Sequence, residues 1–125
     1  MEQFSINDCK LIWDKRQKTT KTAREKIKRD LKENATTIGK AIAFLIQAAK
    51  NGSTPIIKFL LGDNSEYELE MFAQGWPEDF GEVDFEVYIH SGRAGPAVAY
   101  VCSEKYRFVP SSVEDNQFLE EDKIN

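Results

Sequence analysis

The chain has 125 residues, of which 41% are hydrophobic, 11% aromatic and 30% charged, with a net charge of −4. This size and composition fit a single domain with a packed core and exclude a disordered chain. The most apolar stretch, residues 41–46, is far shorter than the roughly 20 residues of a membrane span. No basic segment leads into an apolar run at the N-terminus. The sequence therefore predicts a soluble, cytoplasmic protein without a membrane span and with Cys9 and Cys102 reduced.

The charges are strongly segregated along the chain. Residues 1–50 contain 12 Lys and Arg against 6 Asp and Glu, a net charge of +6. Residues 51–125 contain 5 against 15, a net charge of −10. Such an asymmetry informs about partners and solubility rather than about the fold.

The N-terminal half has helical periodicity. Apolar residues at helical spacing predict a short helix over residues 6–17, although an extended interpretation of residues 4–13 competes with it because short apolar patterns are ambiguous. Thr22 and Glu25 then form a capping box that starts one long amphipathic helix, about residues 23–50. Asn51-Gly52 ends it, and residues of low helix propensity allow a kink or break near Asn34.

After Thr54 the apolar period changes from 3.6 to 2, which predicts strands. The continuous apolar run Ile56–Leu61 is typical of a central strand. The alternating segments that follow predict further strands at residues 66–71, 82–89 and 97–103, with residues 106–109 as an extension or a short fifth strand. One or two helical turns are expected within residues 112–119.

Together these elements predict an α+β domain over residues 1–119. Its N-terminal helices pack on a four- to five-stranded antiparallel meander, which makes a two-layer sandwich. Residues 120–125 are expected to form an acidic, flexible tail.

Basic residues form a candidate binding surface between Lys15 and Lys32. Four of them recur at helical spacing opposite the apolar stripe, and we call them the basic ridge: Lys21, Arg24, Lys28 and Lys32. Such a ridge could contact phosphates, an acidic protein or an anionic membrane. It could equally be a solvated helix face, or meet the acidic sheet of the protein itself.

Carboxylates form the mirror image of this ridge on the expected sheet. Alternation would place six of them on one surface if the two strands pair, and we call this the acidic face: Glu66, Glu68, Glu70, Glu82, Asp84 and Glu86. Like charges directly opposite one another destabilise a sheet, so the face calls for solvent, for cations of the protein or for a basic partner. No metal site is expected, because strand carboxylates lack the loop geometry that wraps Ca²⁺.

Two further segments are candidate contacts. The loop at residues 73–81 carries Trp76 and Phe80, aromatics that either anchor an interface or plug the end of the core. The turn after the third expected strand displays Arg93. The lone His90 could act as a base toward Ser91 or Cys102, but nothing in their spacing requires it.

These features predict a small non-catalytic binding or regulatory protein, such as an inhibitor, immunity-type or adaptor module, without a cofactor. It would engage another protein through its charged surfaces and a loop aromatic. The alternative is a nucleic-acid-associated protein that uses the ridge between Lys15 and Lys32, although the acidic total and the lack of a reading motif disfavour it. Homo-oligomerisation, with the ridge of one subunit on the acidic face of another, is the third hypothesis.

Overall fold

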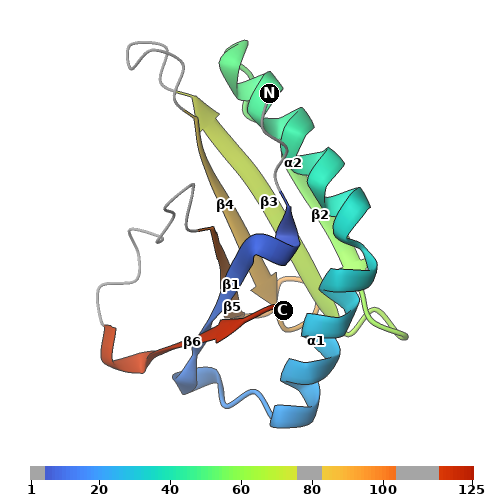
Figure 1. The fold of residues 1–125 in the computed structure, drawn as a ribbon, viewed down its shortest axis with the longest axis vertical. Helices are drawn as coiled ribbons and strands as arrows, with labels where there is room; N and C mark the ends of the chain where they lie inside the picture. Colours follow the sequence, from blue (N-terminus) through green and yellow to red (C-terminus); the bar gives the residue numbers. More distant parts are fainter. Residues whose placement is uncertain (1–4, 76–82, 104–115) are drawn as a thin grey trace.

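Two helices pack on one face of a six-stranded antiparallel sheet (Figure 1). The computed structural model describes residues 5–75, 83–103 and 116–125. The helices are α1 (Lys21–Glu33) and α2 (Ala35–Lys50). The strands are β1 (Cys9–Asp14), β2 (Ile56–Leu61), β3 (Tyr67–Gly75), β4 (Val83–His90), β5 (Ala97–Ser103) and β6 (Leu119–Lys123). Short 3-10 helices are η1 (Ile6–Asp8), η2 (Lys15–Gln17) and η4 (Asn116–Phe118). The expected α+β class is confirmed.

The strand order in the sheet is β2-β3-β4-β5-β1-β6, and every neighbouring pair is antiparallel. The four strands β2 to β5 form the expected meander. The first strand of the chain then lies between β5 and the last strand, so the sheet has six strands rather than four or five. This order leaves β2 and β6 as the two edges.

The helix expected over residues 6–17 is wrong, and its extended alternative is correct for the central part. Within β1, Leu11 and Trp13 are fully buried against the helices, two residues apart as a strand requires. The apolar residues Ile6, Cys9 and Trp13 fit a helical spacing as well, so periodicity alone does not separate the two. Pairing with strands on both sides decides the outcome.

The expected long helix is divided at Asn34, where a kink or break was foreseen. The Asn34 backbone N–H and side-chain amide both donate to the carbonyl oxygen of Asp30, at 3.1 and 2.8 Å. Helix α1 begins earlier than the capping box suggested, because the Thr20 hydroxyl accepts the N–H of Ala23 at 3.1 Å. Gly52, with φ of 84°, follows the end of α2, as expected of a helix C-terminus.

The acidic tail expected at residues 120–125 is also an error for the part that forms β6. These residues pair with β1, and Ile124 is fully buried in the core. The acidic composition suggested solvation, yet alternate carboxylates of β6 point toward cations on α1, as described below.

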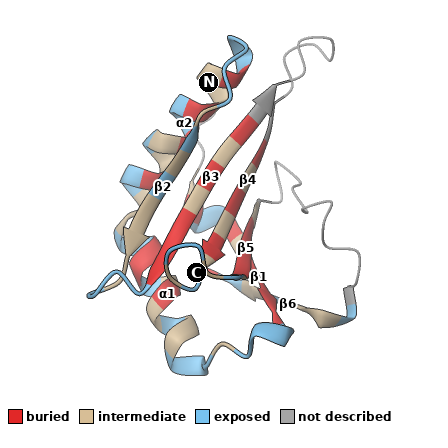
Figure 2. Cartoon of the chain, turned by 180° about the vertical axis from the view of Figure 1, so that it is seen from behind, coloured by how far each residue is buried: buried red, intermediate tan, exposed pale blue. Residues whose placement is uncertain are grey.

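The core lies between the helices and the covered face of the sheet (Figure 2). Alternate residues of each inner strand are buried there, for example Leu69 and Met71 of β3 and Val87 and Ile89 of β4. From α1 and α2, Ile27, Leu31, Ile38, Ile42, Leu45 and Ala49 pack against them. In the described part of the chain, neither helix has the length and apolar surface that a membrane crossing requires.

Candidate functional site

One row of residues crosses all six strands on the face of the sheet opposite the helices, which we call the open face. Directly opposite residues of antiparallel strands point to the same face, so the strand register defines the row. In the order of the sheet it consists of Lys58, Glu70, Tyr88, Tyr100, Ile12 and Glu121. Its centre is aromatic or apolar and both ends are charged.

Four rings gather around this row and form an aromatic cluster: Phe72, Tyr88, His90 and Tyr100. The Tyr88 ring stacks with Phe72 at a centroid distance of 5.9 Å and with His90 at 6.0 Å. Its edge meets Tyr100 at 5.4 Å with an interplanar angle of 73°. These separations lie in the range of favourable aromatic pairs, so Tyr88 is the hub of a preformed group of rings.

The accessible part of the open face lies over β2, β3 and β4. Ile12 and Tyr100 are buried, with 7% and 8% exposure. Phe72, Tyr88 and His90 are each partly exposed. A partner that approaches this face would therefore meet the rings of β3 and β4 rather than those of β5 and β1.

Both ring nitrogens of His90 lie within hydrogen-bond distance of an oxygen atom. Its Nδ1 lies 3.1 Å from the carbonyl oxygen of Gly95, and its Nε2 lies 3.1 Å from Oε1 of Glu70. Both partner oxygens are acceptors, so in each contact the ring nitrogen is the donor. Both ring nitrogens of His90 therefore face partners other than Ser91 and Cys102. Cys102 lies opposite Lys10 of β1 in the register.

The hydroxyl group of Tyr88 donates to Oε2 of Glu86 at 3.1 Å. Burial, together with the negative charge of Glu86, raises the pKa of Tyr88 above its ordinary value. The phenol therefore stays protonated at neutral pH and keeps its donor role. This bond ties the hydroxyl end of the central ring of the cluster to β4.

In the strand register, the described carboxylates of the acidic face lie opposite other residue types rather than opposite one another. Glu70 lies opposite Tyr88 and Glu86 opposite Phe72, while Lys58 approaches Glu70 to 3.7 Å. Glu68 is buried at 9% exposure. The register, which sequence alone does not supply, thus relieves the repulsion that the expected six-carboxylate surface implied. Glu82 and the side chain of Asp84 lie outside the described residues.

Glu66 lies before β3 and belongs to a different contact. Lys26 of α1 binds it at 2.5 Å and binds Asp63 at 3.3 Å. The hydrogen bond between them raises the pKa of Lys26 and lowers the pKa of Glu66. This pair joins α1 to the turn between β2 and β3.

Two members of the basic ridge face the protein's own strand β6, in what we call the α1–β6 seam. Arg24 pairs with Glu120 at 2.5 Å, and Lys28 pairs with Asp122 at 3.3 Å. The buried Trp13 completes the seam, since its Nε1–H donates to Asp122 at 3.2 Å and its ring lies 4.9 Å from the Arg24 guanidinium. The sequence signal that could have indicated this seam is the two-residue spacing of Glu120 and Asp122.

The other cations of the basic segment lie on both sides of this seam: Lys15 and Lys18 precede α1, Lys21 begins it, and Lys32 lies in its last turn. Within the described ranges, the exposed residues Lys15, Lys18, Lys21 and Lys32 form no ion pair. Arg16 differs, because it binds the buried carboxylate of Asp14 at 2.8 Å and lies 5.0 Å from the Phe118 ring. Arg93 is exposed in the β4–β5 turn, and Trp76 and Phe80 lie outside the described residues.

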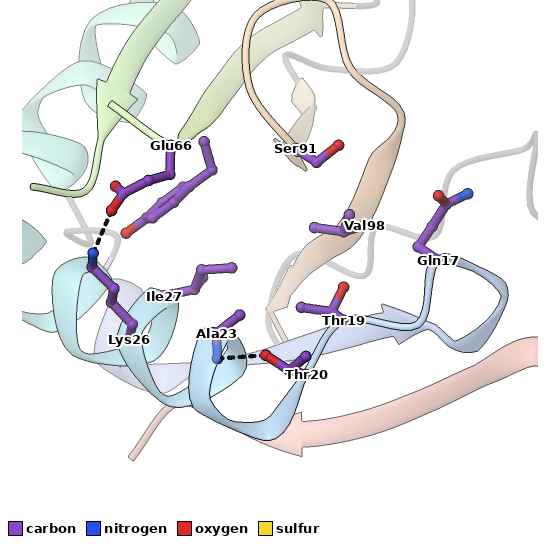
Figure 3. Close-up of a pocket in the computed structure, with 10 residues that line it drawn as sticks. Gln17, Thr19, Thr20, Ala23, Lys26, Ile27, Glu66, Ser91 and Val98 are labelled. Carbon is purple, nitrogen blue, oxygen red and sulfur yellow. Dashed lines mark hydrogen bonds and ion pairs between the residues drawn. The ribbon is translucent and has the colours of Figure 1, made fainter. Parts of the chain in front are cut away.

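A pocket of about 410 Å³ opens between the start of α1, the turn before β3 and the β4–β5 turn (Figure 3). Hydroxyl groups of Thr19, Thr20 and Ser91 line it beside the apolar side chains of Ile27 and Val98. Lys26 and Glu66 also line it, but they bind each other. The pocket thus offers hydroxyl groups and apolar surface, without an unpaired charge among its lining residues to select a ligand.

Within residues 5–75, 83–103 and 116–125, no group of three or more His, Cys, Asp or Glu side chains is arranged to hold a metal ion. Comparison of the chain with known protein families, with curated proteins and with solved structures gives no match.

Proposed function

We propose that the protein is a binding module that engages another protein through the accessible part of the aromatic cluster on the open face. The observation that supports this proposal is the group of partly exposed rings at Phe72, Tyr88 and His90, bordered by Lys58 and Glu70. Aromatic residues surrounded by a polar rim are the usual anatomy of a protein interface. The core of this fold is built on the other face, so packing alone does not explain these rings.

The charged residues around the cluster favour recognition of one orientation of a partner. Glu70 binds both His90 and Lys58, which orders the rim before a partner arrives. Preformed rims reduce the entropy cost of association. In this respect the proposal differs from the sequence-based hypothesis: the rings supply the affinity, and the charges supply orientation rather than an acidic grip.

A capture experiment with truncated rings tests the proposal. Proteins retained from native lysate by the wild type should be lost, by about tenfold or more, in Phe72→Ala and Tyr88→Ala. Lys40→Ala is the control, because Lys40 is an exposed residue with a long side chain on α2, in the layer opposite the open face, and takes part in neither proposed contact. Equal capture by all four proteins would show that the cluster is not the binding surface.

Nucleic acid stays a second candidate because Lys15, Lys18 and Lys21 are exposed and form no ion pair in the described part of the chain. Pairing of Arg24 and Lys28 with β6 leaves fewer cations for phosphates than the ridge suggested. Titration against labelled DNA and RNA at two salt concentrations separates the candidates. Binding at low salt that is lost on changing these three lysines to glutamine would replace the protein-binding proposal.

A further inference from the structure

Strand β2 is an edge of the sheet, although its continuous apolar sequence predicted a central strand. It pairs with β3 along one side only. Alternate residues of an edge strand direct their backbone N–H and C=O groups away from the sheet. Such a row of groups is a template for pairing with another strand, unless charge, a bulge or a covering segment protects it.

The side chains of β2 do not protect this edge. Five of its six residues are apolar, and the exception, Lys58, is drawn toward Glu70 of the adjacent strand at 3.7 Å. Ile56 is 58% exposed, and Phe44 of the adjoining helix α2 is 59% exposed. These are the two exposed large hydrophobic residues in the described part of the chain, and both belong to elements at this end of the sheet (Figures 1 and 2).

We propose that two copies of this chain associate through β2, pairing their edge strands antiparallel about a twofold axis to make one continuous twelve-stranded sheet. A second copy fits this edge because five of the six β2 residues are apolar and the one lysine, although 54% exposed, pairs with Glu70 of its own sheet. An equally apolar strand without an unpaired charge therefore matches it. A symmetric dimer brings the same patch to both sides of the interface. This inference concerns a different surface from the aromatic cluster and does not depend on the proposed function.

The two faces of the sheet restrict the register of this pairing. Residues 57, 59 and 61 lie on the helix-covered side, and residues 56, 58 and 60 lie on the open side. Directly opposite residues must share a face, so odd positions pair with odd positions. Centring the axis on Phe59 places Lys58 opposite Leu60 and Ile57 opposite Leu61. That register avoids the repulsion of Lys58 against its own copy, which centring on Lys58 would create.

Measured from the connection between α2 and β2, Phe44 lies at about the same distance along α2 as Phe59, the residue on the proposed axis, lies along β2. It precedes the end of α2 at Lys50 by six residues, about 9 Å along a helix. Phe59 follows the start of β2 at Ile56 by three residues, about 10 Å along a strand. A short connection reverses the chain between Lys50 and Ile56, and α2, which packs mainly on β3, runs along the side of the sheet that ends at β2 (Figure 1). The two Phe44 side chains would thus flank the axis and extend the apolar contact beyond the strands.

The dimer would also place both open faces on one side of a single sheet. Tyr88 of each copy lies on the third strand from the junction, so five interstrand spacings separate them, or about 24 Å. A dimer would therefore present two aromatic clusters to one partner or to two.

Sedimentation equilibrium of the full chain over a wide range of concentration tests the proposal. The expected mass rises from that of one 14.3 kDa chain to twice that value as concentration increases. Ile56→Lys and Phe44→Lys should each raise the dissociation constant of the dimer by about tenfold or more, because each places a solvated charge in the contact. Ala43→Lys is the matched control, since Ala43 is an exposed α2 residue on the flank away from Phe44.

Three results would overturn the proposal. The first is a mass of one chain at every concentration. This result would overturn the proposal even if the monomer used β2 to bind an extended segment of another protein. The second is a dimer that dissociates at high salt, which would indicate the ridge-on-acidic-face arrangement instead. The third is a dimer as stable in both lysine variants as in the wild type. Circular dichroism verifies folding, and the helix-surface variant Phe44→Lys retains the test if Ile56→Lys fails to fold.

Discussion

The two edge strands of the sheet, β6 and β2, have opposite chemistry: one is charged and the other apolar. Strand β6, Leu119–Lys123, carries four charged residues among five, and Glu120 and Asp122 bind cations of α1. Strand β2, Ile56–Leu61, carries one charged residue among six. Charge on an edge strand discourages pairing with other chains, whereas an apolar edge invites it. The number of charges on an edge strand, and where they are directed, thus separates β6 from β2, and under the proposed dimer only β2 pairs with another chain.

The charged residues of β6 also stabilise the protein itself, because two of them bind residues of α1 and β1. Arg24 and Lys28 hold the strand against α1, and the Trp13 ring lies beneath them with its N–H bonded to Asp122. Ile124, just beyond the strand, is fully buried. An apolar anchor and a polar seam thus hold the end of the described chain. Among the described residues, β2 is held instead by its ladder to β3, by the Lys58–Glu70 pair and by its helix-facing side chains.

The largest difference between the edges should appear when one isoleucine of each is shortened. Ile124→Ala should lower the free energy of unfolding by about 2–4 kcal/mol, because it leaves a cavity in the core. Ile56→Ala is the matched control and should cost under about 0.5 kcal/mol in the monomer, since Ile56 is 58% exposed. Denaturant unfolding at low protein concentration measures both. Equal losses would contradict the anchoring of β6 through Ile124.

A smaller effect is expected from the polar seam. Asp122→Ala removes the acceptor of the buried Trp13 N–H and the partner of Lys28, so it should cost about 1–3 kcal/mol. Glu121→Ala, at a neighbouring residue of β6 whose side chain is 70% exposed, should cost about 0.5 kcal/mol or less. Thermal unfolding of the two variants compares them. The seam would be dispensable if both midpoints moved by the same amount.

The smallest effect concerns Asp14, where β1 meets the start of β6. The hydrogen bonds from Arg16 lower the pKa of this buried carboxyl below its ordinary value. A lowered pKa in the folded state contributes stability above the unfolded-state pKa, and that contribution is lost as pH falls through the folded-state pKa. Arg16→Gln should therefore cost about 1 kcal/mol at neutral pH and progressively less below about pH 4.

Urea unfolding at several pH values measures this dependence. Lys15→Gln is its control, because Lys15 is exposed and forms no ion pair in the described part of the chain. A cost for Arg16→Gln that stays constant down to acid pH would show that the pairing with Asp14 is not its source.

Local patterns predicted part of this fold. The bounds of Ile56–Leu61 and Ala97–Ser103 follow from apolar period and turn residues, and the break near Asn34 follows from weak helix propensity. The identity of β1 does not follow, because its apolar spacing suits both a helix and a strand. Whether β2 is central or an edge depends on topology, which no property of its own six residues determines.

The candidate site was less predictable than the fold. Its row depends on the register of five strand pairs, so Lys58, Glu70 and Tyr88 become neighbours only in the folded sheet. The α1–β6 seam joins residues 94 and 96 positions apart in the chain, a contact that composition indicated only as a segregation of charge. The segregation of positive and negative charge along the chain therefore reflects, in part, ion pairs inside the protein rather than binding surfaces alone.

Amide hydrogen exchange of β2 and β6, measured at low and high protein concentration and at low and high salt, tests the contrast between the edges most directly. We expect the outward N–H groups of β2 to exchange more slowly as concentration rises and to be insensitive to salt. Exchange in β6 should not depend on concentration and should become faster as salt weakens its pairs with α1. Exchange in β2 that is independent of concentration would contradict the account.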